Sequence, residues 1–457
     1  MLHVHVLISF VILSLGMSPS LAFSSGFSME KSVKQACQEA QSRFASTSVS
    51  ALKDCKTSDV QKRSLVDGIA EYTFSLQVGP QAEDTIRIHR VVKETNGHPI
   101  STAKAAFLIH GDVFGFDEIF LAGYSVQDGF DSQSYAIFLA QRNIDVWGLD
   151  RRFYGVSETT TDFGFMQNWN FNTEIQDVAT GLAISRTLRV LSGSDGGKLF
   201  LQGWSSGSSV GYAYMNAETQ FPSAFRHVKG FIPTDIAYKF APQETVAKQK
   251  SCDRLTGLQA QFNSGIYQVN GGSGPKLAGQ LAAAAPNASS PLVPGFTNLQ
   301  TALFIGGFIY LVDPSFDIVP VFHQTAANVD ANGIPTGLRF TSVPFFVDFL
   351  QMAKPFLNLG YRLDMETLWC GQTNSTHDDH LGQITVPVMY VGAGGGLGEY
   401  GVYTQSLLGS TDITNLVIDA EPTAERRIFD WGHSDIYLAT SAATTVWTPI
   451  YNWIAAH

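Results

Sequence analysis

The stretch LQGWSSGSS, residues 201–209, decides how this sequence folds. Residues 203–207 match the pattern Gly-x-Ser-x-Gly, in which a strand turns sharply into a helix and the serine hydroxyl projects above the sheet edge. Glycine at both flanking positions removes the Cβ atoms that would clash in such a turn. An apolar run precedes the pattern, and a helix-like segment follows it. We therefore predict that Ser205 is a catalytic nucleophile. The N–H of Ser206, at a helix N-terminus, would donate to an oxyanion.

An alternation of strands and helices continues on both sides of this turn. The run at 103–111 is continuously apolar, which is typical of a strand buried on both faces of a parallel sheet. The helix predicted over 173–191 opens with a capping box of Thr173 and Gln176. The alternation predicts an α/β fold with a mostly parallel central sheet flanked by helices. The expected strands are 72–78 and 85–92 (a hairpin), 103–111, 144–150, 198–204 and 227–233, and the expected helices are 134–143, 173–191 and a helix from 205 onward.

The alternation stops after Asp235 and resumes near residue 386. The intervening segment is rich in Gly, Pro, Ala and Phe and has about the size of a small domain. We interpret it as a large cap inserted before the penultimate core strand, above the carboxyl ends of the strands. After it we expect a strand at 386–393, a helix at 400–408, a strand at 413–419 or 426–430, and a closing helix at 441–454. The expected divisions are a signal peptide (1–22), a mostly helical N-terminal extension (23–70), a core in two parts (71–237 and 384–457) and the cap (238–383).

The N-terminus carries an apolar block, residues 6–17, followed by Ser-Leu-Ala at 20–22. This pattern predicts a secretory signal peptide, with an uncleaved anchor as the alternative. The block is short for a membrane span and no later segment is long enough, so we expect a secreted protein without a stable span. Sequons at Asn287 and Asn374 fit surface glycosylation if the source is eukaryotic. The net charge of −11 argues against a nucleic-acid partner.

Four cysteines remain after this cleavage. An even number of cysteines in a secreted chain predicts disulfides, although three pairings are possible and some cysteines could stay free thiols. A bond between Cys37 and Cys55 would close a short N-terminal loop. A bond between Cys252 and Cys370 would join the two ends of one long segment.

A second motif lies at the end of the strand predicted over 103–111. The run FLIHG ends in His-Gly, and the loop after it should supply the other oxyanion N–H, from Asp112 or Val113. We interpret His110 as a structural residue that holds this loop by hydrogen bonds, because a general base must reach the nucleophile's proton.

A third motif, DWGHSD at 430–435, follows the last strand-like run. On such a loop, His433 can turn one ring nitrogen to Ser205 Oγ while the other faces a carboxylate. We predict that His433 is the general base, because it completes the chain order serine, acid, histidine.

With FLIHG, IDVWGLDRR, GWSSG, VPVMYVGA and WGHSD in this order, the chain resembles the α/β-hydrolase superfamily, in particular its lipase and esterase branch. The resemblance implies a serine hydrolase that cleaves carboxylic esters through an acyl-enzyme, without a metal or organic cofactor. A peptidase or thioesterase of the same fold is an alternative. A catalytically silent binding module is another, although such a module has no need of a strained serine turn.

Two carboxylates are candidates for the acid that would complete a catalytic triad with Ser205 and His433. The family usually carries an Asp shortly after the strand predicted here at 386–393, but glycines occupy that place and the first carboxylate is Glu399. Asp235, just past the strand at 227–233, is the other candidate, with Asp412 and Asp430 as more remote ones. The orienting role suits either carboxylate, because the acid only fixes the imidazole tautomer and stabilises the imidazolium.

The cap would decide the substrate, which we expect to be a small-molecule or lipid ester. Its apolar side chains could line an acyl pocket or form the cap's own core: Phe345, Phe346, Phe349, Leu350 and Phe356. His377 and His380 have the spacing of two metal ligands on a helix face. Their segment is acidic, adjoins a sequon and lacks further spaced ligands, so we interpret it as a surface turn. The oligomeric state is left open.

Overall fold

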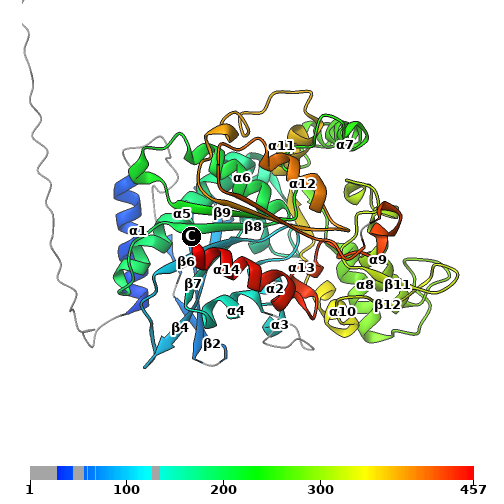
Figure 1. The fold of residues 1–457 in the computed structure, drawn as a ribbon, viewed down its shortest axis with the longest axis horizontal. Coiled ribbons are helices and arrows are strands. Elements are labelled where there is room, and N and C mark those ends of the chain that lie inside the picture. Colours follow the sequence, from blue (N-terminus) through cyan, green and yellow to red (C-terminus); the bar gives the residue numbers. More distant parts are fainter. Residues whose placement is uncertain (1–27, 45–55, 59, 67, 126–133, 422) are drawn as a thin grey trace, which may run out of the picture.

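One large sheet runs through the centre of the computed structural model, which describes residues 28–44, 56–58, 60–66, 68–125, 134–421 and 423–457 (Figure 1). Within these residues the sheet has eleven strands, and two smaller strand pairs lie in the insertion. The strands of the large sheet are β1 (Lys56–Thr57), β2 (Gln61–Ser64), β3 (Ile69–Gln77), β4 (Thr85–Thr95), β5 (His98–Pro99), β6 (Lys104–Ile109), β7 (Ile144–Asp150), β8 (Leu199–Trp204), β9 (Val228–Thr234), β14 (Val388–Ala393) and β15 (Ile413–Ile418).

Most of this sheet is parallel. Strands β7, β6, β8, β9, β14 and β15 are neighbours in that order and all run the same way. The hairpin of β3 and β4 adds antiparallel strands at one side. Every residue of β7, β8 and β14 is buried, which explains why these strands are apolar without alternation. The prediction of an α/β fold with a mostly parallel sheet is confirmed. The loops after β6, β8, β9 and β14 therefore meet at one edge.

Helices flank the sheet, with α5 and α6 toward one side and α4 and α14 toward the other (Figure 1). The start of α5 differs from the prediction. The side chain of Asn170, not Thr173, caps the helix by accepting the N–H groups of Asn172 and Thr173, and Thr173 Oγ1 accepts the N–H of Asn170. The helices of the core are α2 (Phe116–Phe120), α3 (Ala122–Ser125), α4 (Tyr135–Gln141), α5 (Phe171–Leu191), α6 (Ser206–Glu218), α12 (Gly398–Gln405), α13 (Asp435–Leu438) and α14 (Thr448–Ala456).

The N-terminal extension is only partly helical. Helix α1 (Met29–Phe44) packs beside α5 (Figure 1), but β1 and β2 pair with β3 as edge strands of the large sheet. The prediction of a mostly helical extension did not include these two strands, because both are short and β2 is largely exposed, so they lack an apolar pattern. The signal peptide and Cys55 lie outside the described residues. Of the two candidates for the last strand, 413–418 forms β15, whereas Ala424–Phe429 forms a 3₁₀ turn.

The insertion between β9 and β14 contains helices and two small antiparallel strand pairs, which lie beyond the carboxyl edge of the sheet (Figure 1). Its elements are α7 (Thr245–Asn263), β10 (Gln268–Asn270), α8 (Ser273–Ala284), α9 (Asn298–Phe308), β11 (Ala327–Val329), β12 (Pro335–Leu338), α10 (Val343–Gln351), β13 (Phe356–Asn358) and α11 (Leu359–Cys370). The predicted cap before the penultimate core strand is confirmed. Both sequon asparagines, Asn287 and Asn374, are exposed on it. Among the described helices, none combines the length and apolar character needed to cross a bilayer.

A disulfide between Cys252 on α7 and Cys370 at the end of α11 joins these two cap helices. The bond closes a loop with a sequence separation of 118 residues, so it restricts the unfolded chain strongly. Replacing both cysteines by serine is expected to lower the free energy of unfolding by about 4–5 kcal/mol. Thermal and urea unfolding of the wild type and the double variant would measure this loss. Equal stability of the two proteins would contradict the expectation.

Candidate active site

The turn after β8 holds Ser205 in a strained backbone conformation, with φ 57° and ψ −131°. A positive φ is rare for a non-glycine residue and marks a site where surrounding structure enforces it. Ser205 N–H donates to Thr234 O of the adjacent strand at 2.9 Å, which fixes the turn. The flanking glycines are required by close approach: a Cβ on Gly203 would lie 2.4 Å from Gly207 O, and one on Gly207 would lie 2.3 Å from Ile109 O.

The Gly207→Ala variant is expected to lose most of any activity that depends on this turn and to be less stable by about 1–3 kcal/mol. The added methyl group would meet backbone oxygens of Ile109 and His110, which cannot move aside as a flexible side chain can. Gly274→Ala is the matched control, because a Cβ there meets nothing within 4 Å. Thermal unfolding and ester turnover of both variants would test this; a Gly207→Ala protein that behaves like the control would refute it.

His433 and Asp235 form a buried pair beside this turn. His433 Nδ1 lies 2.5 Å from Asp235 Oδ2, and both side chains are almost completely buried. The other oxygen of Asp235 accepts the N–H groups of Ala393 and Leu397 at 2.8 and 3.0 Å. A carboxylate in this position can accept the proton on His433 Nδ1, which leaves Nε2 as the nitrogen able to accept another.

Glu399 lies elsewhere. It is in the first turn of α12, its side chain is 68% exposed, and Oε1 faces Arg427 at 3.5 Å. The glycines that occupy the usual acid position have a steric reason, since a Cβ on Gly396 would lie 2.0 Å from Asp235 Oδ2. Of the two remote candidates, Asp430 accepts backbone N–H groups of its own loop, including that of Ala420, and Asp412 contacts His457.

The two residues predicted to supply oxyanion N–H groups, Ser206 and Asp112, line the same cavity as Ser205. Ser206 is the first residue of α6, and Asp112 lies in the loop after β6. Within the described part of the chain, neither N–H has a hydrogen-bond acceptor, so both are available to a ligand. Val113, next in that loop, has φ 55°, and Phe114 N–H donates to Asp112 O at 2.7 Å across it. For a β-branched residue this conformation is strained, so the surrounding contacts must enforce it.

His110 holds the same loop, as predicted from the sequence. Its Nδ1 lies 2.8 Å from Gly111 O, and its Nε2 accepts the N–H of Arg151 at 2.9 Å. Burial lowers the pKa of His110 to about 4, so the ring is neutral at pH 7 and donates through Nδ1. Because both nitrogens are occupied, His110 is a structural residue.

The loop that carries His433 is paired with a segment of the cap. His433 N–H donates to His323 O at 2.9 Å, and Ser434 N–H donates to Gln324 O at 2.7 Å. Buried Asp435 holds the two segments together: its Oδ2 accepts the N–H groups of Gly432 at 2.8 Å and of Ala326, in the cap, at 3.1 Å. Its Oδ1 accepts the hydroxyl of Thr341, also in the cap, at 2.6 Å. Sequence reasoning missed these contacts, since the two segments are about a hundred residues apart and no local pattern marks backbone pairing.

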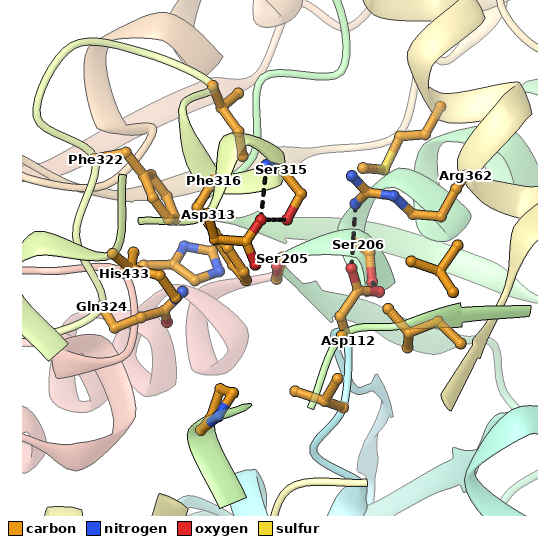
Figure 2. Close-up of a pocket in the computed structure, with 18 of the residues that line it drawn as sticks. Asp112, Ser205, Ser206, Asp313, Ser315, Phe316, Phe322, Gln324, Arg362 and His433 are labelled. Carbon is orange, nitrogen blue, oxygen red and sulfur yellow. Dashed lines mark hydrogen bonds and ion pairs between the residues drawn. The ribbon is translucent and has the colours of Figure 1, made fainter. Parts of the chain in front are cut away.

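A cavity of about 420 Å³ opens between the core and the cap, and Ser205, Ser206, Asp112 and His433 all line it (Figure 2). The rest of its wall is mainly apolar. Of the cap side chains singled out from the sequence, Phe346, Phe349 and Leu350 line the cavity. Phe345 is completely buried but does not line it, and Phe356 packs against Phe163. Polar groups on the wall include Arg254, Arg362, Asp313, Ser315 and Gln324.

One group of residues has the spacing of a metal site among the residues that the structure describes: Glu71, His89 and Asp117, whose ligand atoms lie within 4.8 Å of one another. Its contacts do not fit a metal. Both nitrogens of His89 are engaged, Nδ1 with Glu71 at 2.8 Å and Nε2 with Asp150 at 3.0 Å, and Arg63 pairs with Glu71 and Asp117. This is a buried ion-pair network. No sequence pattern indicates this network, because its members come from separate strands and a helix.

Replacing His89 by glutamine is expected to make stability less dependent on pH above neutrality. Although burial opposes the charged ring, the Asp150 and Glu71 carboxylates outweigh it and raise the pKa of His89 to about 10. The folded protein therefore keeps a proton that the unfolded chain loses near pH 6.5, so this stabilisation is complete below pH 6.5 and disappears toward pH 10. The wild type should lose roughly 3–5 kcal/mol more than His89→Gln across this range. Urea unfolding of both proteins at pH 6.5, 8 and 9.5 measures these free energies. If the free energies of unfolding of the two proteins change with pH by the same amount, the expectation is wrong.

Solved structures share this architecture. A candidate lipase of Sulfolobus solfataricus superposes with a TM-score of 0.58, covering 88% of this chain and 99% of the other, at 16% sequence identity. A monoglyceride lipase of Saccharomyces cerevisiae (TM-score 0.41, 14% identity, 88% and 96% covered) and a carboxyl esterase of Bacillus coagulans (TM-score 0.42, 14% identity, 86% and 99% covered) superpose too weakly to support an inference. No protein-family model and no curated protein matches the sequence. The first superposition and the strand order show that this chain has the α/β-hydrolase fold, so the resemblance is confirmed at that level.

Proposed function

We propose that this protein is a serine hydrolase that cleaves carboxylic esters, with Ser205 as nucleophile, His433 as general base and Asp235 as the orienting acid. The observation that carries the proposal is the 2.5 Å contact between His433 Nδ1 and buried Asp235, at the cavity that strained Ser205 also lines. The N–H groups of Ser206 and Asp112 would bind the oxyanion. Glu399, exposed and paired with Arg427, has no part in this proposal.

The reaction would proceed in two halves. Ser205 Oγ attacks the ester carbonyl carbon while its proton passes to His433 Nε2, and the carbonyl oxygen becomes the oxyanion. The intermediate collapses when His433 returns the proton to the leaving alkoxide, which departs as the alcohol and leaves an acyl-serine. Water then attacks the acyl carbon with His433 again accepting the proton, and the carboxylic acid is released with Ser205 restored.

The substrate class follows from the cavity. The wall that it shares with Ser205 includes Phe114, Phe346, Phe349 and Leu350, so an apolar acyl chain in the cavity would be removed from water. We therefore propose small-molecule or lipid esters as substrates. The lipase of similar fold from Sulfolobus solfataricus agrees with this class. The signal-like residues 1–22 support secretion of the mature chain.

A series of p-nitrophenyl esters with acyl chains from two to sixteen carbons, given to the mature protein, tests this function. kcat/KM is expected to rise with chain length until the cavity is filled, at roughly fourfold per added methylene. Phe349→Ala should weaken the preference for long chains, whereas Phe345→Ala, which removes a ring outside the cavity, should not. Hydrolysis of a peptide or thioester series with no ester turnover would replace the proposed substrate class, and no turnover of any series would favour the silent binding module.

A further inference from the structure

The loop that supplies the second oxyanion N–H is held by the cap at three consecutive residues. Two cap side chains, Tyr361 and Arg362 of α11, contact the carboxylate of Asp112. Val113 O accepts the N–H of Lys354 at 2.7 Å. The ring of Phe114 stacks on that of Phe349 in α10, with centroids 3.8 Å apart and planes at 21°. Because these contacts all come from the cap, the strained conformation of the loop depends on the cap.

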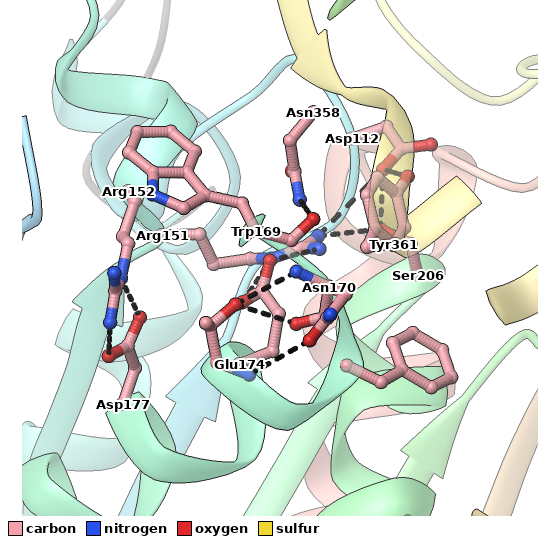
Figure 3. A network of polar contacts seen from close by, with 12 residues as sticks. Asp112, Arg151, Arg152, Trp169, Asn170, Glu174, Asp177, Ser206, Asn358 and Tyr361 are labelled. Atoms are coloured by element: carbon pink, nitrogen blue, oxygen red, sulfur yellow. Dashed lines mark hydrogen bonds and ion pairs between the residues drawn. The ribbon is translucent and has the colours of Figure 1, made fainter. Parts of the chain in front are cut away.

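Asp112 also joins the loop to the residue that follows the nucleophile. Ser206 Oγ donates to Asp112 Oδ1 at 2.6 Å and accepts from Arg151 Nη1 at 2.9 Å (Figure 3). Arg151 is completely buried and held by Glu174, with nitrogen–oxygen distances of 2.9 to 3.2 Å. The two residues that carry the oxyanion N–H groups are therefore bonded to each other through their side chains.

The Tyr361 hydroxyl donates to the same oxygen, Asp112 Oδ1, that accepts from Ser206 (Figure 3). Burial and the neighbouring Asp112 carboxylate raise the pKa of Tyr361, so this hydroxyl stays protonated and remains a donor. The Tyr361 ring also covers the Arg151 guanidinium, at 4.6 Å from the ring centre. Tyr361 thus contacts both side chains that hydrogen-bond to Ser206, Asp112 and Arg151.

A carboxylate so close to an oxyanion would oppose the reaction if it were unpaired. Arg362 Nη1 lies 3.3 Å from Asp112 Oδ2, and Arg151 Nη1 lies 3.8 Å from Oδ1, so two guanidinium groups offset the charge. Arg362 faces the cavity, where Figure 2 shows its contact with Asp112. The Asp112 side chain can therefore anchor the loop without repelling the developing anion.

Helix α11 can act as such an anchor because it is fixed to the core. Asn358 Nδ2, just before the helix, donates to Trp169 O at 3.1 Å (Figure 3), and Phe171 N–H donates to Asp364 Oδ2 at 2.8 Å. Its far end is joined to α7 by the Cys252–Cys370 disulfide. Motion of α11 would therefore be passed to Asp112.

From these contacts we infer that Tyr361 and Arg362 are positioning residues of the oxyanion hole: acting through Asp112, the cap sets the distance between the Asp112 and Ser206 N–H groups. This inference rests on the proposed function. It assigns the cap a part in the chemical step, in addition to its part in lining the acyl cavity.

Tyr361→Phe tests the inference, because it removes the donor to Asp112 and keeps the ring over Arg151. kcat for a p-nitrophenyl ester is expected to fall about 10–100-fold with KM within about twofold, as for a misplaced oxyanion donor. Tyr238→Phe is the matched control: it removes an equally buried hydroxyl that donates to His377 O at 2.9 Å and touches no part of the site. The control should keep the wild-type kcat.

A second readout separates positioning from a loss of stability. An alkyl trifluoromethyl ketone adds reversibly to a serine: Oγ bonds to the carbonyl carbon, the hydroxyl proton goes to His433, and the carbonyl oxygen becomes an oxyanion in the hole. The inhibition constant of this ketone should rise in Tyr361→Phe by the same factor as kcat/KM falls. The corresponding alkyl methyl ketone, which forms no covalent adduct with the serine, should bind Tyr361→Phe and the wild type equally well. Arg362→Met, which removes the nearer of the two guanidinium groups that offset the Asp112 charge, should act in the same direction.

A double-mutant cycle decides whether Tyr361 works through Asp112. In an Asp112→Ala background, Tyr361→Phe should cause no further loss of kcat. Full additivity of the two changes, an unchanged kcat in Tyr361→Phe, or an equal loss in Tyr238→Phe would overturn the inference while the wild type still hydrolyses esters. A wild type without esterase activity would instead remove the proposed function and this inference with it.

Discussion

The Ser205→Ala variant is expected to lose roughly a million-fold in kcat for ester hydrolysis while keeping the wild-type melting temperature. The change removes the atom that forms the acyl-enzyme, so the remaining N–H groups and cavity can only bind the ester. Removing one hydroxyl from a turn that is held by backbone contacts leaves the fold unaffected. Initial rates with a p-nitrophenyl ester and thermal unfolding by circular dichroism measure the two quantities.

Ser209→Ala provides the matched control for this variant. Ser209 lies in the first turns of α6, four residues after Ser205, and is completely buried, but its hydroxyl has no hydrogen-bond partner among the described residues. It should retain the wild-type rate. If Ser205→Ala keeps more than about a hundredth of the wild-type kcat, another group is the nucleophile.

The Asp235→Asn variant is expected to lower kcat about ten-thousand-fold, whereas Glu399→Gln should leave it within about twofold. The asparagine carbonyl would stay with the donors already in place, Ala393 and Leu397 N–H, and would turn its amide NH₂ toward His433 Nδ1. His433 would then carry its proton on Nε2 and could not accept the proton of Ser205.

The pH dependence of kcat/KM for both variants completes this comparison. Glu399→Gln should reproduce the wild-type profile, since its side chain is exposed and faces Arg427. The reverse outcome, a large loss in Glu399→Gln and a small one in Asp235→Asn, would contradict the assignment of the acid. Small losses in both would direct the search to Asp412 and Asp430.

The core of the fold could be predicted from the sequence because its signals are local. Buried parallel strands such as β7 and β8 are mostly apolar and show no regular alternation, and the turn at Ser205 carries a glycine two residues away on each side. The short strands β1 and β2 lack such a pattern and are not evident from the sequence. The start of α5 was misplaced because Asn170 and Thr173 both suit a helix N-terminus, and only the structure distinguishes them.

The acid could not be chosen from the sequence, since Asp235 and Glu399 each follow a strand and the choice depends on distances across the sheet. The sequence does contain one signal for this choice. Glycines follow β14 where an acid is usual, and at Gly396 the lack of a side chain provides the space that the Asp235 carboxylate occupies. A carboxylate absent from one strand end, together with glycines there, indicates that a neighbouring strand supplies it.

The contacts between the cap and the two catalytic loops were also beyond the sequence. Tyr361 and Asp112 are 249 residues apart, and the pairing of Gln324 with Ser434 involves backbone atoms that any residue possesses. The apolar content of the cap predicted a lining for the cavity, which holds for Phe346 and Phe349. It carried no information about the support that α11 gives to the oxyanion loop.

Covalent labelling with a fluorophosphonate is the most direct test of the central claim that Ser205 is an activated nucleophile. The mature protein should be labelled at one site, and mass spectrometry of the digest should place the phosphonate on the peptide that contains Ser205. Ser205→Ala and heat-unfolded wild type should not react. Labelling of the folded wild type at another residue, equal labelling of Ser205→Ala, or no reaction at all would contradict the account.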